Sequence, residues 1–342
     1  MTFGEPLEKT MKPWKTLLAL ISLSLPLTFS ACGGGDSGTT GTTPKPAGAS
    51  TIHLAVIPKG TQHVFWKSVE AGARKAAEEL HVEMEWKGPI LENDRAGQIQ
   101  VLQQFITRHP SGIVLAPLDH AALVDPVKDA TAAGIPVVII DSGLDGQPGK
   151  DYAAFVATNN KQGGIMAGEA LAKELGNKGK VVLLRYLEGS ASTTDREEGF
   201  LEVMKKYNIQ VLVSNRFGGP GASEAQTTSL QIMNQIKEAD GIFASNEPTT
   251  LGMLQALRQN ELAGKKKFVG FDASDELVDG LKKGEIQALV AQNPVKMGYE
   301  GVKAVVAKIK GEKVEPNVDS GAALITKENV DSDDIQKLLG KK

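Results

Sequence analysis

The sequence predicts an α/β protein made of two lobes, each built on a doubly wound parallel sheet. Short runs rich in Val, Ile, Leu and Ala alternate along the chain with longer segments of helical period. The runs are almost continuously apolar, which is typical of parallel strands covered by helices on both faces. At 342 residues the chain also exceeds the usual size of a single hydrophobic core. Two sheets, each of about five strands, are therefore favoured over one.

The predicted elements follow in order along the chain. The apolar runs that we expect to be strands cover residues 52–57, 112–117, 135–141, 153–158, 180–186, 210–214, 241–245, 267–272 and 287–292. The clearest helical periods span Val64–Leu80, Asp94–His109 and Thr250–Asn260. This number of strands is too large for one small domain, so we expect the strands to be shared between two sheets.

Composition excludes several classes of function. The formal net charge is -3 and the sequence pI is about 6.0, so we expect no nucleic-acid partner. The single cysteine excludes an intramolecular disulfide bond. No P-loop, H-E-x-x-H motif, or G-x-G-x-x-G after a strand is present. We interpret His53, His81, His109 and His120 as structural, because they lack metal-ligand spacing. We therefore expect neither a metal ion nor a cofactor.

The first residues have the pattern of an export signal. A basic segment around Lys12 precedes the apolar stretch Leu17–Leu27, which is too short to span a bilayer, and small residues for cleavage follow it. Residues 1–31 are therefore interpreted as a signal peptide of the lipoprotein type. Met11 starts an ordinary signal by itself, so we expect translation to begin there.

Cys32 follows these small residues and precedes glycines, an arrangement that resembles the lipobox of bacterial lipoproteins. Residues 32–50 consist mainly of Gly, Thr, Ser, Pro and Ala and cannot form a core, so they predict a flexible tether. We expect Cys32 to be acylated and the exported protein to be anchored to a membrane, in the periplasm or on the cell surface. The alternative is a plain secretory signal with an incidental cysteine.

Polar residues follow the predicted strands at their carboxyl ends, where open parallel sheets bind ligands. These positions are Lys59 with His63, Asp119, Asp141-Ser142, Asn159-Asn160, Asn215-Arg216, Asn246-Glu247, Asp272 and Gln292-Asn293. The turn after the first strand adds two aromatic residues, Phe65 and Trp66. Carboxylates, amides and an arginine beside aromatic rings suit a hydroxyl-rich ligand with apolar faces. This inventory predicts a site for a sugar-like molecule.

Several segments carry a resemblance to a known family. They are "HVFWKSVEAGA", "IPVVIIDS", "VATNNKQGG", "DREEGF", "GIFASNEPTTLGML", "FVGFDAS" and "ALVAQNPVKMGYEG". In this order they resemble the periplasmic sugar-binding proteins of the ribose-binding type, which feed ATP-driven importers, over residues 51 to about 326. The resemblance implies ligand contacts at His63, Phe65, Trp66, Asp141, Arg196, Asn246, Asp272 and Gln292. It also implies a small-molecule sugar or polyol as ligand and an ABC importer permease as partner.

The same resemblance implies a type I periplasmic binding protein fold, with two lobes joined by a hinge of three chain crossings. The N-terminal lobe would comprise residues 51–158 and 293–321, and the C-terminal lobe residues 159–292 and 322–342. The crossings would lie near Thr158, Gln292-Asn293 and Ala322. A ligand that touches both lobes would then stabilise a closed form.

One departure from the family concerns a charged group. Ribose binders have an arginine after the strand-end aspartate, where this chain has Ser142. Lys59, on the turn after the first strand, is our candidate for the replacement cation, although lysine specifies geometry less tightly than arginine. Lys59 and Ser142 complete the set of candidate ligand contacts. The sequence leaves the ligand open among pentoses, hexoses, polyols and nucleosides.

Alternatives remain at this stage. Asp141 and Asp272 could be helix N-caps, and Arg196 could pair with a neighbouring glutamate on a solvated face. Carboxylates facing each other across a sugar-sized cleft would also suit a carbohydrate-active enzyme, but we expect no enzyme because the recognised catalytic motifs are absent. A receptor that signals through a membrane sensor cannot be separated from an importer-linked protein by sequence.

Overall fold

The computed structural model describes residues 51–341. The predicted signal peptide, the predicted acylation site Cys32 and the predicted tether lie outside these residues. Within the described residues, no helix is long and apolar enough to cross a lipid bilayer.

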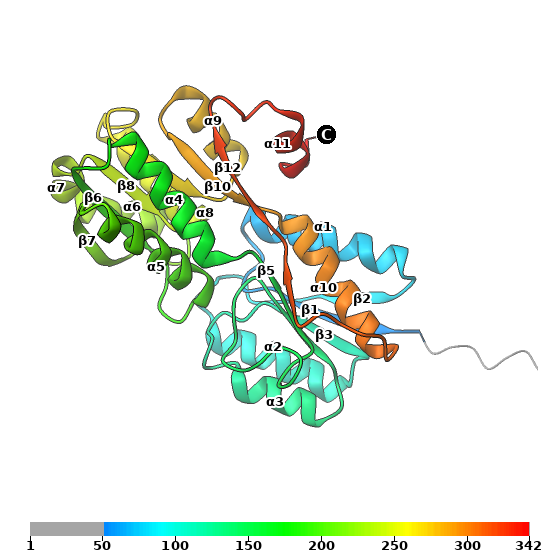
Figure 1. Cartoon of the computed structure of the whole chain (residues 1–342). Helices are drawn as coiled ribbons and strands as arrows, with labels where there is room; N and C mark the ends of the chain where they lie inside the picture. The colour runs from blue at the N-terminus through cyan, green and yellow to red at the C-terminus, as the bar shows by residue number, and fades with distance from the viewer. Residues whose placement is uncertain (1–50, 342) are drawn as a thin grey trace, which may run out of the picture. The chain divides into compact units, whose positions relative to one another are not determined.

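Two six-stranded sheets organise the described chain (Figure 1). The first sheet has the order β11-β5-β4-β3-β1-β2 and is parallel throughout. Its strands are β1 (His53–Ile57), β2 (Glu83–Trp86), β3 (Gly112–Leu115), β4 (Val137–Ile140), β5 (Ala154–Ala157) and β11 (Asn317–Asp319). The predicted fold class, two parallel-sheet α/β lobes, is confirmed.

The second sheet has the order β12-β10-β9-β8-β6-β7 and is parallel except for β12, which runs antiparallel to β10. Its strands are β6 (Lys180–Arg185), β7 (Gln210–Phe217), β8 (Gly241–Ala244), β9 (Lys267–Phe271), β10 (Ala288–Gln292) and β12 (Ala322–Thr326). In each sheet the strand order reverses between two adjacent parallel strands: the chain adds strands on one side of β1 and then on the other, beginning with β3, and it does the same around β6, beginning with β8. Ligand crevices form at such switch points.

Helices cover both faces of each sheet. They are α1 (Val64–Glu79), α2 (Arg95–Arg108), α3 (Val124–Ala132), α4 (Asn160–Glu174), α5 (Ala191–Lys206), α6 (Ala222–Gln231), α7 (Met233–Glu238), α8 (Glu247–Gln259), α9 (Asp275–Lys283), α10 (Pro294–Ile309) and α11 (Asp333–Leu338). In the first sheet, Val56 packs in one core cluster with α1 and α10, whereas Ile57 packs in another with α2 and α3. This alternation explains why the strands are apolar at nearly every position.

All nine predicted strands are present, and three further strands were not predicted. These three, β2, β11 and β12, lie at sheet edges. The residues of β2 alternate between exposed and half-buried, and β11 is only three residues long. β2 and β11 therefore lack the continuous apolar run on which the prediction depended, whereas β12 has such a run over four residues and was nevertheless not predicted.

Two pairs of helices pack closely because glycines face each other's backbone. A Cβ atom on Gly164 of α4 would overlap the carbonyl of Arg196 in α5, and a Cβ on Gly72 of α1 would overlap the carbonyl of Val295 in α10. Glycine therefore lets α5 approach α4 closely enough to fix the position of Arg196.

The chain passes between the two sheets three times: between β5 and α4, between β10 and α10, and between β11 and β12. Thr158 Oγ1, at the first crossing, donates to Gln292 Oε1 at the second (2.9 Å) and lies 3.4 Å from Ser320 Oγ at the third. The three crossings are thus adjacent and share one buried hydrogen-bond network.

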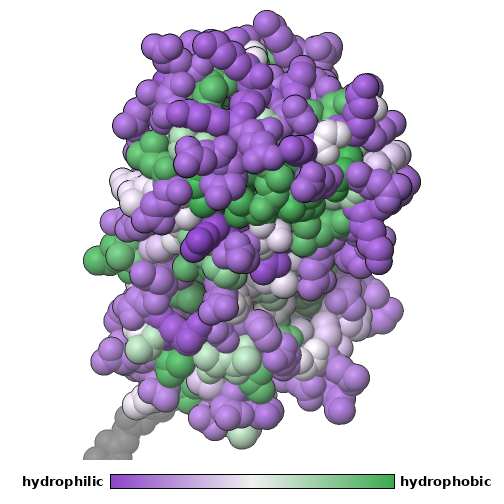
Figure 2. Space-filling view, turned by 90° about the vertical axis from the view of Figure 1, so that its left-hand side faces the viewer, coloured by the Kyte–Doolittle hydropathy of each residue, from purple (hydrophilic) through white to green (hydrophobic). Residues whose placement is uncertain are grey.

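Figure 2 shows one side of the molecule, on which hydrophilic side chains cover most of the surface and hydrophobic ones gather in separate groups. Among the described residues, the large hydrophobic side chains with the greatest exposure include Val64, Ile90 and Leu91. Limited exposure of this kind is usual on protein surfaces.

Candidate functional site

The carboxyl ends of the two sheets border one cavity that contains about 340 Å³ of space not filled by protein atoms. Its lining comes from both lobes: Lys59, His63, Phe65, Trp66, Glu92, Asp141, Tyr186, Ser192, Thr193, Arg196, Asn246, Glu247, Pro248, Asp272 and Gln292. Nine of the ten candidate ligand contacts line this cavity, and Ser142 does not.

A buried ion pair forms one wall. Lys59 follows β1, Asp141 follows β4, and Lys59 Nζ lies 2.9 Å from Asp141 Oδ2 with each side chain 4% exposed. Lys59 also donates to Ser192 Oγ of the other lobe (3.0 Å). Asp141 has a left-handed backbone (φ 62°) and precedes no helix that it could cap. Such a conformation in a non-glycine residue is uncommon and is often found at functional sites.

The start of helix α1 supplies the aromatic wall. Trp66 is buried, Phe65 is half-buried, and their rings meet edge to face with centroids 5.0 Å apart. Trp66 Nε1 donates to Glu92 Oε1 (2.8 Å). His63 Nε2 donates to the carbonyl of Pro220 in the other lobe (2.9 Å). These contacts fix the aromatic rings against the polar side of the cavity.

Arg196, in the first turns of α5, projects into the second lobe's side of the cavity and is only 2% exposed. Its Nε donates to Asn160 Oδ1 (2.9 Å), one Nη donates to the Ser245 carbonyl (3.1 Å), and the guanidinium stacks 3.9 Å from the centre of the Phe271 ring. Burial lowers the pKa of Arg196, and the charges of Asp272 and Asp141 oppose this shift. The alternative of a solvated surface ion pair is therefore wrong.

Asp272 is the counterpart of Asp141 in the second lobe, and it too has a left-handed backbone (φ 68°). Its Oδ1 accepts from Gln292 Nε2 (2.7 Å) and its Oδ2 accepts from the Glu247 backbone N–H (2.8 Å). The N-cap of the helix that follows it is Ser274, so Asp272 does not cap that helix. Burial raises the pKa of Asp272, while the charge of Arg196 opposes the rise.

Two residues at the start of α8 complete the second lobe's wall. Asn246 is the N-cap, and its Oδ1 accepts from the Thr249 backbone N–H (3.3 Å) and hydroxyl (2.7 Å). Glu247 Oε2 accepts from the Phe65 backbone N–H of the other lobe (3.2 Å). Burial, with the charge of Asp272, raises the pKa of Glu247 to about 7.

The sequence and the fold identify the family to which this site belongs. Residues 54–313 match the model of the periplasmic binding protein domain. The chain belongs to the periplasmic binding protein family. The ribose import binding protein of Haemophilus influenzae is 30% identical over 276 residues, which cover 78% of this chain and 88% of that protein.

Solved structures agree with this placement of the binding protein. A carbohydrate transporter solute-binding protein from Agrobacterium radiobacter, in complex with D-arabinose, is 36% identical with a TM-score of 0.81, covering 85% of this chain and 99% of that one. A solute-binding protein from Agrobacterium vitis with bound D-fucose is 34% identical with a TM-score of 0.80, covering 83% and 98%.

Ser142 has a different contact in this binding protein from the one expected. Its Oγ accepts from the backbone N–H of Ser192 at the start of α5 (3.1 Å). The side chain therefore joins the two lobes beside the cavity and does not line it. The sequence could not show this, because it does not give the distance between the lobes.

Several lining residues were not among the candidates. Glu92 lies in the loop between β2 and α2, and Tyr186 directly follows β6. No local pattern marks Glu92 as functional. Tyr186 was included in a predicted strand, although its place after a strand was itself a usable signal. Glu247 is one of the polar residues at the carboxyl end of β8, but it was not predicted to contact the ligand.

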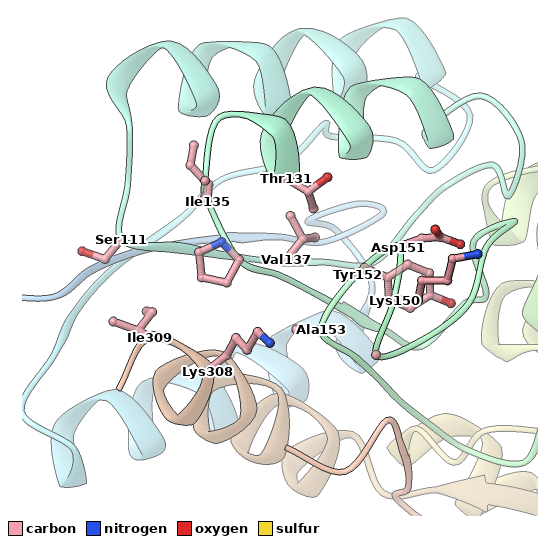
Figure 3. A pocket seen from close by; sticks show the side chains of 13 residues that line it. Ser111, Thr131, Ile135, Val137, Lys150, Asp151, Tyr152, Ala153, Lys308 and Ile309 are labelled. Carbon is pink, nitrogen blue, oxygen red and sulfur yellow. The ribbon is translucent and has the colours of Figure 1, made fainter. Parts of the chain in front are cut away.

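A larger hollow of about 900 Å³, partly open to solvent, lies at the amino ends of the strands of the first sheet (Figure 3). Its lining includes Ser111, Ile135 and Ala153, which precede or begin strands, with Lys150 and Lys308 at its side. Ligands of open parallel sheets bind at the carboxyl ends of the strands and not at their amino ends. The interlobe cavity is therefore the better candidate despite its smaller volume.

Proposed function

We propose that this exported protein captures a sugar or polyol in the interlobe cavity and delivers it to an ABC importer permease. The observation that carries the proposal is the convergence of charged and amide groups beside Phe65 and Trp66 in one buried space. Asp141, Arg196, Asp272 and Gln292 offer directional donors and acceptors for hydroxyl groups. The aromatic rings offer apolar surfaces for the C–H faces of a sugar ring.

The similar proteins support a ligand of monosaccharide size. The similar proteins include a ribose import binding protein and solute-binding proteins in complex with D-arabinose and D-fucose. Ser142 stands where the resemblance to ribose binders implies an arginine, and Lys59 is the nearby cation instead. The thermal-shift screen below is designed to identify the sugar.

Closure about the three crossings would link ligand capture to delivery. The ligand would contact groups of both lobes and would stabilise only the form in which they meet. Small-angle scattering on the protein without its signal peptide should show a fall in the radius of gyration when ligand is added. A tightly bound ligand that leaves the scattering profile unchanged would contradict closure as the signal for the importer.

A lipid anchor would keep the binding protein near its importer. We propose that Cys32 becomes the acylated first residue, because its neighbours resemble a lipobox. The full chain should label with radioactive palmitate and remain in the membrane fraction, since several acyl chains exceed the two signals needed for stable attachment. The Cys32→Ser variant should be released. Retention of this variant without label in the wild type would refute acylation.

The direct test of sugar binding is a thermal-shift screen with D-ribose, D-arabinose, D-allose, D-fucose and a set of polyols, followed by calorimetry. A ligand at a hundredfold excess over its Kd should stabilise the protein by about 2.7 kcal/mol. A set of nucleosides is screened in parallel, and stabilisation by nucleosides alone, or by no compound tested, would contradict the proposed ligand class.

A further inference from the structure

Two buried polar side chains of the cavity have no role in the family resemblance or among the candidate contacts. Tyr186 is 1% exposed, and its hydroxyl makes no hydrogen bond of standard geometry with any described residue, although the Glu92 carboxylate lies close enough to act on it as an acceptor. Glu92 is 6% exposed and lines the same cavity. A buried hydroxyl without a partner costs free energy unless something in the site satisfies it. The poor geometry of its contact with Glu92 therefore leaves the Tyr186 hydroxyl able to donate to a ligand in the cavity.

The Glu92 carboxylate is firmly held. Its Oε1 accepts from Trp66 Nε1 (2.8 Å) and lies 3.6 Å from His63 Nε2. Its side chain lies against Gly60, where a Cβ atom would come within 2.8 Å of Glu92 Cγ. The residue thus reaches the cavity from an otherwise exposed loop because the turn after β1 leaves room for it.

We propose that Glu92 and Tyr186 together recognise one hydroxyl group of the bound sugar or polyol and so determine which ligand is accepted. This inference rests on the proposed function. The Tyr186 hydroxyl donates a hydrogen bond to the oxygen of the ligand hydroxyl. The ligand hydroxyl in turn donates a hydrogen bond to the Glu92 carboxylate. A donor next to an acceptor matches a hydroxyl, which has both capacities, and matches neither a hydrogen atom nor a methyl group.

The charges around the pair support these roles. Burial raises the pKa of Tyr186 well above its ordinary value, and the charge of Glu92, a hydrogen bond to Glu92 and the charge of Asp141 add to this rise. The phenol therefore stays protonated and remains a donor at neutral pH. The Glu92 side chain faces those of His63 and Trp66, and its carboxyl oxygens supply the acceptor of the pair.

The pair is divided between the lobes, because Glu92 follows a strand of the first sheet and Tyr186 follows a strand of the second. A ligand hydroxyl bound by both residues would therefore be recognised only when the lobes meet. Selectivity would act on closure, and not only on the first encounter with one lobe.

A purely structural role for Glu92 is the competing explanation, because the carboxylate also orients Trp66. The test separates the two with Tyr186→Phe and Glu92→Gln, since glutamine keeps an oxygen for the Trp66 indole. The matched controls are Tyr207→Phe and Glu169→Gln, a tyrosine–glutamate pair (2.8 Å) outside the cavity. Thermal unfolding and circular dichroism of each variant without ligand establish that it folds.

Calorimetry would use the tightest-binding sugar among D-ribose, D-arabinose, D-allose and D-fucose, together with every monodeoxy derivative of that sugar. Tyr186→Phe and Glu92→Gln should each weaken the parent sugar by about 10- to 100-fold, as expected for a lost hydrogen bond in a buried site. One deoxy derivative should bind poorly to the wild type and lose no further affinity in Tyr186→Phe. The control variants should bind the parent sugar like the wild type.

The outcomes are distinct. Unchanged affinity for the parent sugar in both variants overturns the inference, and so does an equal loss for the parent and every deoxy derivative, which indicates a structural role. A wild-type protein that binds no sugar in the set overturns the proposed function instead.

Discussion

The Lys59–Asp141 pair gives the sharpest test of how the cavity holds its ligand. Replacing Lys59 with methionine keeps most of the side-chain volume but removes the charge that faces Asp141 Oδ2 at 2.9 Å. In the observed form, the aspartate would then be a buried carboxylate without its cation. We expect the substitution to impair ligand binding far more than folding.

The magnitude follows from the geometry. Two unit charges 2.9 Å apart attract by about 6 kcal/mol at an effective dielectric constant of about 20. The net effect is smaller because desolvation opposes it, and removal of one partner from a buried pair costs about 3 to 5 kcal/mol. In an open, solvated cleft the same pair is worth roughly 0 to 1 kcal/mol. The difference of about 2 to 5 kcal/mol predicts that affinity falls by roughly 30-fold to several thousand-fold.

The assay is calorimetry with the tightest-binding sugar of the screen, with thermal unfolding measured on the ligand-free protein. Lys128→Met is the control, because Lys128 pairs with Asp125 at 3.3 Å on the exposed surface. Asp141→Asn in the Lys59→Met background completes a double-mutant cycle. The two effects should be strongly non-additive, because removal of the carboxylate charge removes the reason for the penalty.

Two results would refute this reasoning. One is a loss of affinity under about threefold for Lys59→Met, within the range of an exposed pair. The other is additivity of the two substitutions, which would show that the lysine and the aspartate act independently.

Three further predictions concern other parts of the structure. Because burial raises the pKa of Glu247 to about 7 and an open cleft would return it towards its ordinary value, closure takes up a proton. Sugar affinity measured by calorimetry should then be constant above about pH 7 and increase as the pH falls from about 7 to 5.5, by up to about tenfold per pH unit, and Glu247→Gln should flatten this slope. Arg196→Ala and Asp272→Ala should each weaken sugar binding by about 1.5 to 3 kcal/mol or more, through lost charge-assisted hydrogen bonds; wild-type affinity in both variants would place the site elsewhere. Gly164→Ala should lower the melting temperature, because the added methyl group meets the backbone of helix α5; an unchanged melting temperature would show that the two helices can separate without cost.

The sequence predicted the fold well because the central strands of both sheets are buried on both faces and are therefore continuously apolar. Edge strands such as β2, which alternates between exposed and half-buried residues, do not carry this pattern. The rule that ligands bind at the carboxyl ends of parallel strands also brought together residues far apart in the chain, such as Lys59 and Asp272. Their role as ligand contacts stays a prediction.

What sequence could not supply was the arrangement of one lobe against the other. Glu92 comes from a loop without a recognisable pattern, and its neighbours are known only once Trp66 is placed. Ser142 lies where the resemblance to ribose binders implies an arginine, yet its contact is a helix of the opposite lobe. The case of Ser142 depends on the distance between the lobes and that of Glu92 on the path of a loop within the first lobe, and no periodicity of hydrophobic residues encodes either.

The contacts of Ser142 and Glu247 affect how well ordered the first turns of helices α1 and α5 are. Helices α1 and α5 have no side-chain cap of their own, and each receives an acceptor from the opposite lobe, from Glu247 and Ser142 respectively. Each lobe therefore caps the N-terminus of a helix in the other lobe. If the lobes separate, both helix ends lose a cap worth about 1 kcal/mol, and the first turn of α1, which carries the aromatic wall, becomes free to fray. Ligand capture would then also be a local folding event, with the exchange of the Phe65 and Ser192 amide hydrogens slowing together as the helix ends become ordered.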